Sequence, residues 1–133
     1  MTYVVDTHAL LWFLIGSARL GAGTRKALED PEQPFVLPAT ALAEACWIVE
    51  RGRIPTIAGP AQVIAALDAD DRFTIAPLDR RVVERANGLT AIGEMHDRQI
   101  AATALLRIDR GERTALLTCD NDIAASEVVP IHW

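Results

Sequence analysis

The sequence contains little lysine, little cysteine and no long hydrophobic run. Its 133 residues include two cysteines, Cys46 and Cys119, too few for a disulfide framework. We expect both to be small buried hydrophobic residues in a reducing cytoplasm. The longest apolar run, 9–15, is much shorter than the about 20 residues of a membrane-spanning helix, and no basic segment precedes it. These absences predict a cytoplasmic protein with no membrane segment.

Repeats, linkers and low-complexity segments are also missing. Half of the residues are hydrophobic, which is enough apolar surface for a packed core. We therefore expect residues 1–133 to form a single compact domain.

The charges are predominantly acidic. Aspartate and glutamate total 18 against 13 lysines and arginines, a formal net charge of −5. Taken alone, this excess of negative charge argues against a nucleic-acid partner. Lys26 is the only lysine, and arginine has the planar fork that suits phosphate, although the base composition of a genome can produce the same bias.

Apolar β-type segments alternate with segments of helical periodicity. The predicted strands are 2–5, 35–37, 73–75, 114–118 and 129–131. The predicted helices are 9–14, 24–29, 41–51, 61–67, 80–87, 98–109 and 123–126. Gly52 and Gly111 are candidate helix stops. This order predicts an α/β fold with a central parallel sheet of about five strands and helices on both faces.

Two acids follow predicted buried strands. Asp6 comes directly after Val4 and Val5, and Asp120 follows the 114–118 strand. Either residue could simply cap the next helix, which is the commoner role of aspartate at such a junction. However, ligand sites of open α/β sheets collect at the carboxyl ends of strands. A shared site is therefore expected only if further acids converge there.

Glu44 is the acid hardest to explain structurally. On a helical wheel it falls at the edge of the apolar arc, next to Ile48, whereas Glu50 points away from that arc. It lies too far into the helix to cap it. The structural alternative is a partly exposed ion pair with Arg51 or Arg53.

Asp97 heads the inward-facing stripe of the 98–109 helix. It could be a capping residue, or an acid that the following small residues, Ala101, Ala102 and Ala104, bring close to the sheet. Arg98 points off this stripe and either orients a carboxylate or meets solvent.

Four converging acids would need a cation. Two carboxylates ~4 Å apart repel by roughly 4 kcal/mol at an effective dielectric constant near 20. Oxygen ligands favour Mg²⁺ or Mn²⁺, and no cysteine–histidine spacing suggests zinc. His8 and His96 could orient ligands but are more simply structural, and His132 is interpreted as part of a tail.

Four segments in this order resemble the PIN-domain nucleases, and specifically the VapC-like toxins of bacterial toxin–antitoxin pairs. They are Val-Val-Asp-Thr-His-Ala-Leu-Leu-Trp (4–12), Ala-Leu-Ala-Glu (41–44) with Gly52-Arg53-Ile54, His-Asp-Arg-Gln-Ile-Ala-Ala-Thr-Ala (96–104) and Leu-Leu-Thr-Cys-Asp (116–120). The Asp-Pro pair usual before the third acid is absent, and Glu94-Met95-His96 stands there instead.

The resemblance implies a single PIN-like domain that acts as a Mg²⁺- or Mn²⁺-dependent endoribonuclease. Its catalytic acids would be Asp6, Glu44, Asp97 and Asp120. Asp6, Asp97 and Asp120 would bind metal, with Glu44 and Asp122 as further candidate ligands. The residues expected to support them are Thr7, Thr118 and Arg98.

The resemblance further implies an RNA substrate, a small VapB-like antitoxin and a cytoplasmic homodimer. The negative charge is then no objection, because omitting Asp6, Glu44, Asp97, Asp120 and Asp122 changes the net charge from −5 to 0. Bound divalent cations would make the site locally positive.

Three other protein classes were compared with this interpretation. An aspartyl phosphatase would need a second aspartate two residues after Asp6, where His8 stands. A phospho-receiver domain commonly uses a well-placed lysine, and Lys26 is not in that place. A PIN-like module that binds RNA or a protein through a vestigial acidic pocket, without catalysis, remains the alternative.

Overall fold

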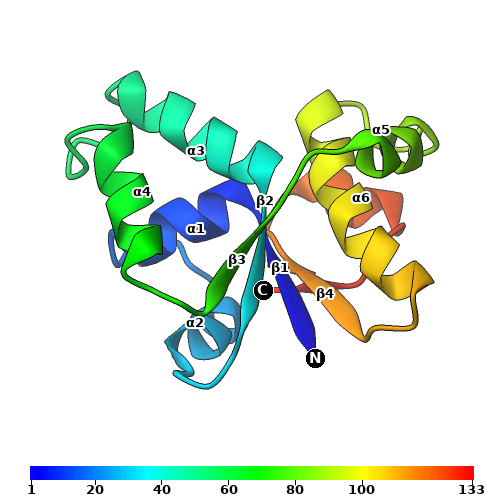
Figure 1. Ribbon diagram of the computed structural model, residues 1–133, viewed down its shortest axis with the longest axis horizontal. Coiled ribbons are helices and arrows are strands. Elements are labelled where there is room, and N and C mark those ends of the chain that lie inside the picture. The colour runs from blue at the N-terminus through cyan, green and yellow to red at the C-terminus, as the bar shows by residue number, and fades with distance from the viewer.

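The computed structural model describes residues 1–133 and contains a five-stranded, wholly parallel sheet (Figure 1). The strand order is β3-β2-β1-β4-β5. The strands are β1 (Thr2–Val5), β2 (Phe35–Pro38), β3 (Phe73–Ala76), β4 (Thr114–Leu117) and β5 (Ile131–His132). The predicted α/β fold with a parallel sheet is thus confirmed.

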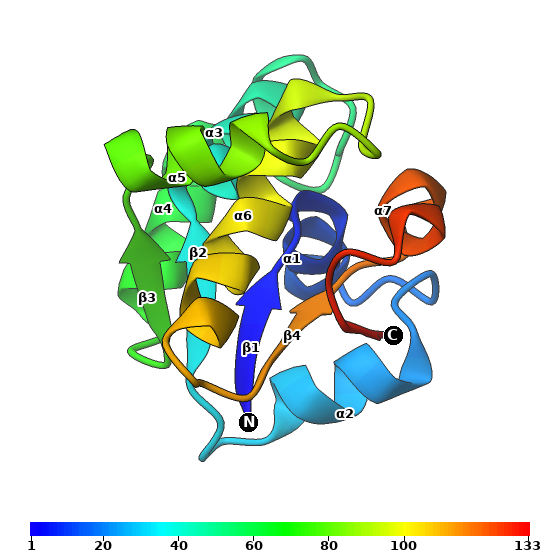
Figure 2. The same ribbon diagram turned by 90° about the vertical axis from the view of Figure 1, so that its right-hand side faces the viewer.

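Seven helices connect and cover these strands. They are α1 (Thr7–Leu14), α2 (Ala22–Glu29), α3 (Ala39–Glu50), α4 (Pro60–Asp68), α5 (Arg80–Asn87), α6 (Met95–Asp109) and α7 (Asn121–Ser126). α1, α3 and α4 lie on one face of the sheet, and α5 and α6 lie on the other (Figure 1). α7 lies beyond the carboxyl end of β4 and close to the carboxyl terminus of the chain (Figure 2).

The chain produces this arrangement by reversing direction once. It adds β2 and β3 on one side of β1, returns through α5 and α6, and then adds β4 and β5 on the other side. Because β1 is central, its carboxyl end lies beside that of β4, with Val5 in register with Leu117. This reversal places the first and last acidic segments next to each other.

Small side chains allow the helices to approach the sheet closely. Ala101, Ala102 and Ala104 of α6 and Ala41 and Ala45 of α3 are fully buried. α3 and α6, on opposite faces of the sheet, also contact each other. The predicted inward stripe of α6 and the outward direction of Glu50 are both confirmed.

Several details of the prediction were wrong. β3 is an edge strand whose central residues, Thr74 and Ile75, are exposed, so it is not buried on both faces. His132 belongs to β5 and its ring lies 5.4 Å from that of Tyr3, so it is not part of a free tail. α6 begins at Met95 rather than at 98. No helix has the length and apolar character needed to cross a membrane.

Candidate active site

Asp6 is held rigidly at the end of β1. Its side chain is buried, with Oδ1 accepting from the Thr7 backbone N–H (2.7 Å) and Oδ2 accepting from the Thr118 hydroxyl (2.5 Å). Burial raises the pKa of Asp6, and the hydrogen bond from Thr118 opposes this rise. The capping hypothesis was correct, but it accounts for only one of the two carboxylate oxygens.

Asp120 also caps a helix while facing the same region. Its Oδ1 accepts from the Ile123 backbone N–H at the start of α7 (2.9 Å), and its own N–H donates to the Thr118 hydroxyl oxygen (3.1 Å). Thr118 therefore hydrogen-bonds to both strand-end acids at once. This residue follows β4 directly, so the sheet itself positions the bridge.

Glu44 reaches the site from α3. It accepts a hydrogen bond from the Thr7 hydroxyl at Oε1 (3.0 Å), and its Oε2 lies 3.8 Å from Nδ1 of His96. Burial, the largest cause, raises the pKa of Glu44. The alternative of an ion pair with Arg51 or Arg53 was wrong, since both guanidinium groups lie over the Trp47 ring instead.

Asp97 lies in the first turn of α6 but does not cap it. The cap is Glu94, whose carboxylate accepts from the Asp97 backbone N–H (2.9 Å). Burial, followed by the negative charges of Asp120 and Asp6, raises the pKa of Asp97 to about 7. A carboxyl group with a pKa raised by burial and by neighbouring acids, at the wall of a cavity, is a candidate functional residue.

The four acids line one cavity of about 270 Å³. Its walls are completed by Thr7, His8, Trp12 and Cys119. Asp122 is exposed on α7 and is not among the lining residues, so the structure does not bring it to the cavity.

The chemistry of these donors fits a hard divalent cation, because four of the eight lining residues carry carboxylates and Thr7 adds a hydroxyl. Three of its four carboxyl groups have raised pKa values, partly through repulsion by one another, which a cation would relieve. No three histidine, cysteine, aspartate or glutamate side chains are already assembled at metal-binding distances. The types of donor atom therefore suit a divalent cation, but the side chains are not already arranged at coordination distances.

Two predicted roles need correction. Arg98 does not contact a site carboxylate: its Nε donates to the backbone carbonyl of Ile92 (2.5 Å), which holds the loop before α6. Cys119 is exposed beside the acids, and Cys46 is only half-buried, so neither is the fully buried residue expected from the sequence.

Glu94 lies next to the site and supports it, a role that its sequence position did not predict. Glu94 was noted only as a departure from the family pattern, yet it caps α6 and lies 2.9 Å from Nδ1 of His96. No capping motif marked Glu94 in the sequence, because glutamate is not among the residues preferred at an N-cap.

Comparison with known proteins identifies the family. Residues 3–128 match the model of the PIN domain, so the chain belongs to the PIN domain family. No curated protein sequence matches it significantly.

Solved structures share the fold at low sequence identity. A chain of VapBC2 from Rickettsia felis, bound to a DNA fragment from its promoter, has a TM-score of 0.69 at 16% identity, with 98% of this chain and 97% of that chain covered. Mycobacterium tuberculosis VapC20, described as a sarcin-ricin loop cleaving toxin, has a TM-score of 0.68 at 16% identity, with 98% and 99% covered. A toxin–antitoxin complex from Klebsiella pneumoniae has a TM-score of 0.64 at 21% identity, with 92% and 90% covered.

Proposed function

We propose that this chain is a Mg²⁺- or Mn²⁺-dependent endoribonuclease. The observation that carries the proposal is the convergence of Asp6, Glu44, Asp97 and Asp120 on one cavity, from four separate parts of the chain. Membership of the PIN domain family supports it. Residues 1–133 would act as a single nuclease domain.

Asp6, Asp97 and Asp120 would hold the cation, and Glu44 would either bind it or orient the attacking water. A divalent cation bound there would lower the pKa of a coordinated water and neutralise charge on the scissile phosphate. Thr118 keeps Asp6 in place and favours its ionised form, while Thr7 fixes the Glu44 carboxylate. The two threonines thus position two of the four carboxylates.

We further propose a VapC-like role as the toxin of a toxin–antitoxin pair. Support comes from the solved structures of similar fold, which are described as toxins or toxin–antitoxin complexes. The proposal includes an RNA substrate, inhibition by a small VapB-like antitoxin, a cytoplasmic location and a homodimer.

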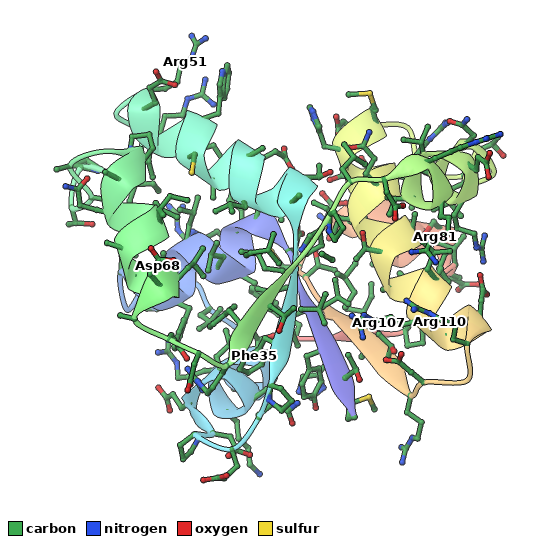
Figure 3. The ribbon with its side chains drawn as sticks, viewed as in Figure 1. Phe35, Arg51, Asp68, Arg81, Arg107 and Arg110 are labelled. Carbon is green, nitrogen blue, oxygen red and sulfur yellow. The ribbon has the colours of Figure 1, made fainter.

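The central test is cleavage of a mixed RNA preparation by the purified chain with added Mg²⁺ or Mn²⁺. Asp6→Asn and Asp97→Asn should each abolish cleavage, because an amide keeps the shape and removes the charge. Asp68→Asn is the matched control, since Asp68 is exposed on α4, far from α6 (Figure 3). Calorimetric titration without RNA should show that the wild type and Asp68→Asn bind Mn²⁺, and that Asp6→Asn and Asp97→Asn do not.

Cleavage that persists in excess EDTA, or in Asp97→Asn, would contradict metal-dependent hydrolysis. RNA binding without cleavage under any divalent cation would instead support the non-catalytic module.

A further inference from the structure

A second cavity adjoins the acidic one. It encloses about 700 Å³ between α3, α6 and the segment before α5, and we call it the Trp47 groove. Glu44 and His8 line both cavities. Because the two spaces share these side chains, a polymer that occupies the acidic cavity can continue into the groove.

The groove has an exposed aromatic wall. Trp47 is 48% exposed and lies three residues after Glu44 on α3, which is about 4.5 Å along a helix axis and on the same side of the helix. Exposed Leu78 and Met95 line the groove as well. A large indole left half in solvent one turn from a catalytic acid is available to a ligand.

Two arginines surround this indole without an acidic partner. The Cζ atoms of Arg51 and Arg53 lie 4.1 Å and 5.7 Å from the ring centroid of Trp47. Neither guanidinium forms a salt bridge within the chain. Arg51 extends beyond the end of α3 into solvent (Figure 3). Arg51 and Arg53 therefore provide two positive charges that no acidic side chain pairs with, although the net charge of the whole chain is −5.

The groove also has hydrogen-bonding groups. The Thr40 hydroxyl donates to Oε1 of Gln99 (2.8 Å), which orients the Gln99 side chain and leaves its Nε2 group as a donor for a ligand. A flat apolar surface with cations beside it and an amide within it matches a nucleobase and its flanking phosphates.

We infer that the Trp47 groove binds one unpaired nucleobase of an RNA strand whose neighbouring phosphate lies at the acidic cavity. The base packs against the exposed part of the Trp47 indole, and Arg51 and Arg53, whose guanidinium groups already lie over the ring, neutralise the flanking phosphates. The inference rests on the proposed ribonuclease function and assigns Trp47 as a residue that holds the substrate strand beside the cut. A duplex cannot place a base on the indole without unpairing it.

The test measures binding rather than cleavage. Fluorescence anisotropy of a labelled single-stranded RNA would be followed in the Asp97→Asn background, which should not cleave the RNA during the measurement. Trp47→Leu in that background should weaken binding roughly tenfold to a hundredfold, the range of one base–aromatic stack, whereas Trp47→Phe should retain most of the affinity. Thermal unfolding of each variant would check that the fold is intact.

A series of RNAs, each with a single abasic nucleotide at a different position, tests the same contact from the side of the ligand. One position should reproduce the loss seen with Trp47→Leu, and combining both changes should cause no additional loss. Double-stranded RNA of the same sequence should bind equally well to the Asp97→Asn protein with and without Trp47→Leu.

The arginines are tested by salt dependence. Arg51→Gln with Arg53→Gln should lower the slope of log affinity against log salt by about 1.4, as expected for two contacts to single-stranded phosphate. Arg110→Gln with Arg113→Gln is the control, because these two substitutions remove equal charge at exposed positions. Arg110 follows α6 (Figure 3), and Arg113 directly precedes β4, at its amino end. This control should leave the slope unchanged.

Equal binding of intact and abasic RNAs, or unchanged affinity in Trp47→Leu, would overturn the inference. So would a Trp47→Leu protein that keeps RNA affinity but loses its oligomeric state in light scattering, since the groove would then be a protein interface. If the wild-type chain binds intact RNA more tightly than abasic RNA but does not cleave it, the proposed hydrolysis is wrong and the base-binding role of the Trp47 groove stands. The two failures are therefore distinguishable.

Discussion

The Thr118 hydroxyl donates a hydrogen bond to Oδ2 of Asp6 across 112 positions of sequence. The Thr118 hydroxyl oxygen also accepts a hydrogen bond from the Asp120 backbone N–H. One hydroxyl thus fixes two candidate metal ligands at the adjoining ends of β1 and β4.

Replacing Thr118 with valine, which has nearly the same shape, should therefore affect both stability and metal binding. The buried Asp6 oxygen loses its donor, so we expect a loss of about 1–3 kcal/mol of unfolding free energy. The pKa of Asp6 should also rise further, because the hydrogen bond from Thr118 lowers it, and Mn²⁺ affinity at neutral pH should fall. Urea denaturation and calorimetry would measure the two effects. Thr118→Ser, which keeps the hydroxyl, should bind Mn²⁺ as the wild type does; if it is as impaired as valine, packing rather than the hydrogen bond is responsible.

Asp120 and Asp122 should separate metal binding from helix capping. Asp120→Asn keeps a capping oxygen for Ile123, so stability should stay close to that of wild type while Mn²⁺ affinity falls. Asp120→Ala should in addition lose about 1 kcal/mol of stability. Asp122→Asn should change neither property, because Asp122 is exposed outside the cavity. Loss of Mn²⁺ binding in Asp122→Asn would show that α7 rearranges around the ion.

The stability of the metal-free protein should depend on the ionisation of Asp97. Its pKa is raised from 3.8 to about 7, so between these values the folded state binds a proton that the unfolded state has released. This contribution makes stability fall as pH rises through that window. Mg²⁺ should remove the trend by supplying positive charge.

Asp97→Asn isolates this contribution from the other acids. In the metal-free state the variant should be more stable than wild type above neutral pH, and its response to Mg²⁺ should be small. Thermal unfolding of both proteins, with and without Mg²⁺ at matched ionic strength from about pH 5 to about pH 8, makes the comparison. A variant with the same pH slope as wild type would show that Asp97 is not the titrating group.

The ends of the cleaved RNA should report the chemistry. Attack by water activated at the acids leaves a 5′-phosphate and a 3′-hydroxyl, whereas attack by the ribose 2′-hydroxyl leaves a cyclic phosphate. The distinction is informative here because His8 and His96 line the same groove beside the acids. Mass spectrometry of the products identifies the ends. Cyclic phosphates would transfer the catalytic role from the acids to these histidines.

The sequence by itself determined the alternation of elements and the positions of the acids. Buried strands such as β4 are continuous apolar runs, and α6 shows its inward stripe as a helical period, because both patterns depend only on neighbours within a few residues. The same local chemistry places Asp6 and Asp120 where the first N–H groups of a helix need acceptors.

Only the tertiary structure decided which residues meet. The link from Thr118 to Asp6 depends on the strand order, and the contact of Thr7 with Glu44 depends on how α1 and α3 pack together. The edge position of β3 and the exposure of Cys119 have the same origin. Local patterns specify what each segment is, whereas contacts between distant segments arise from packing the whole chain, which no short stretch of sequence records.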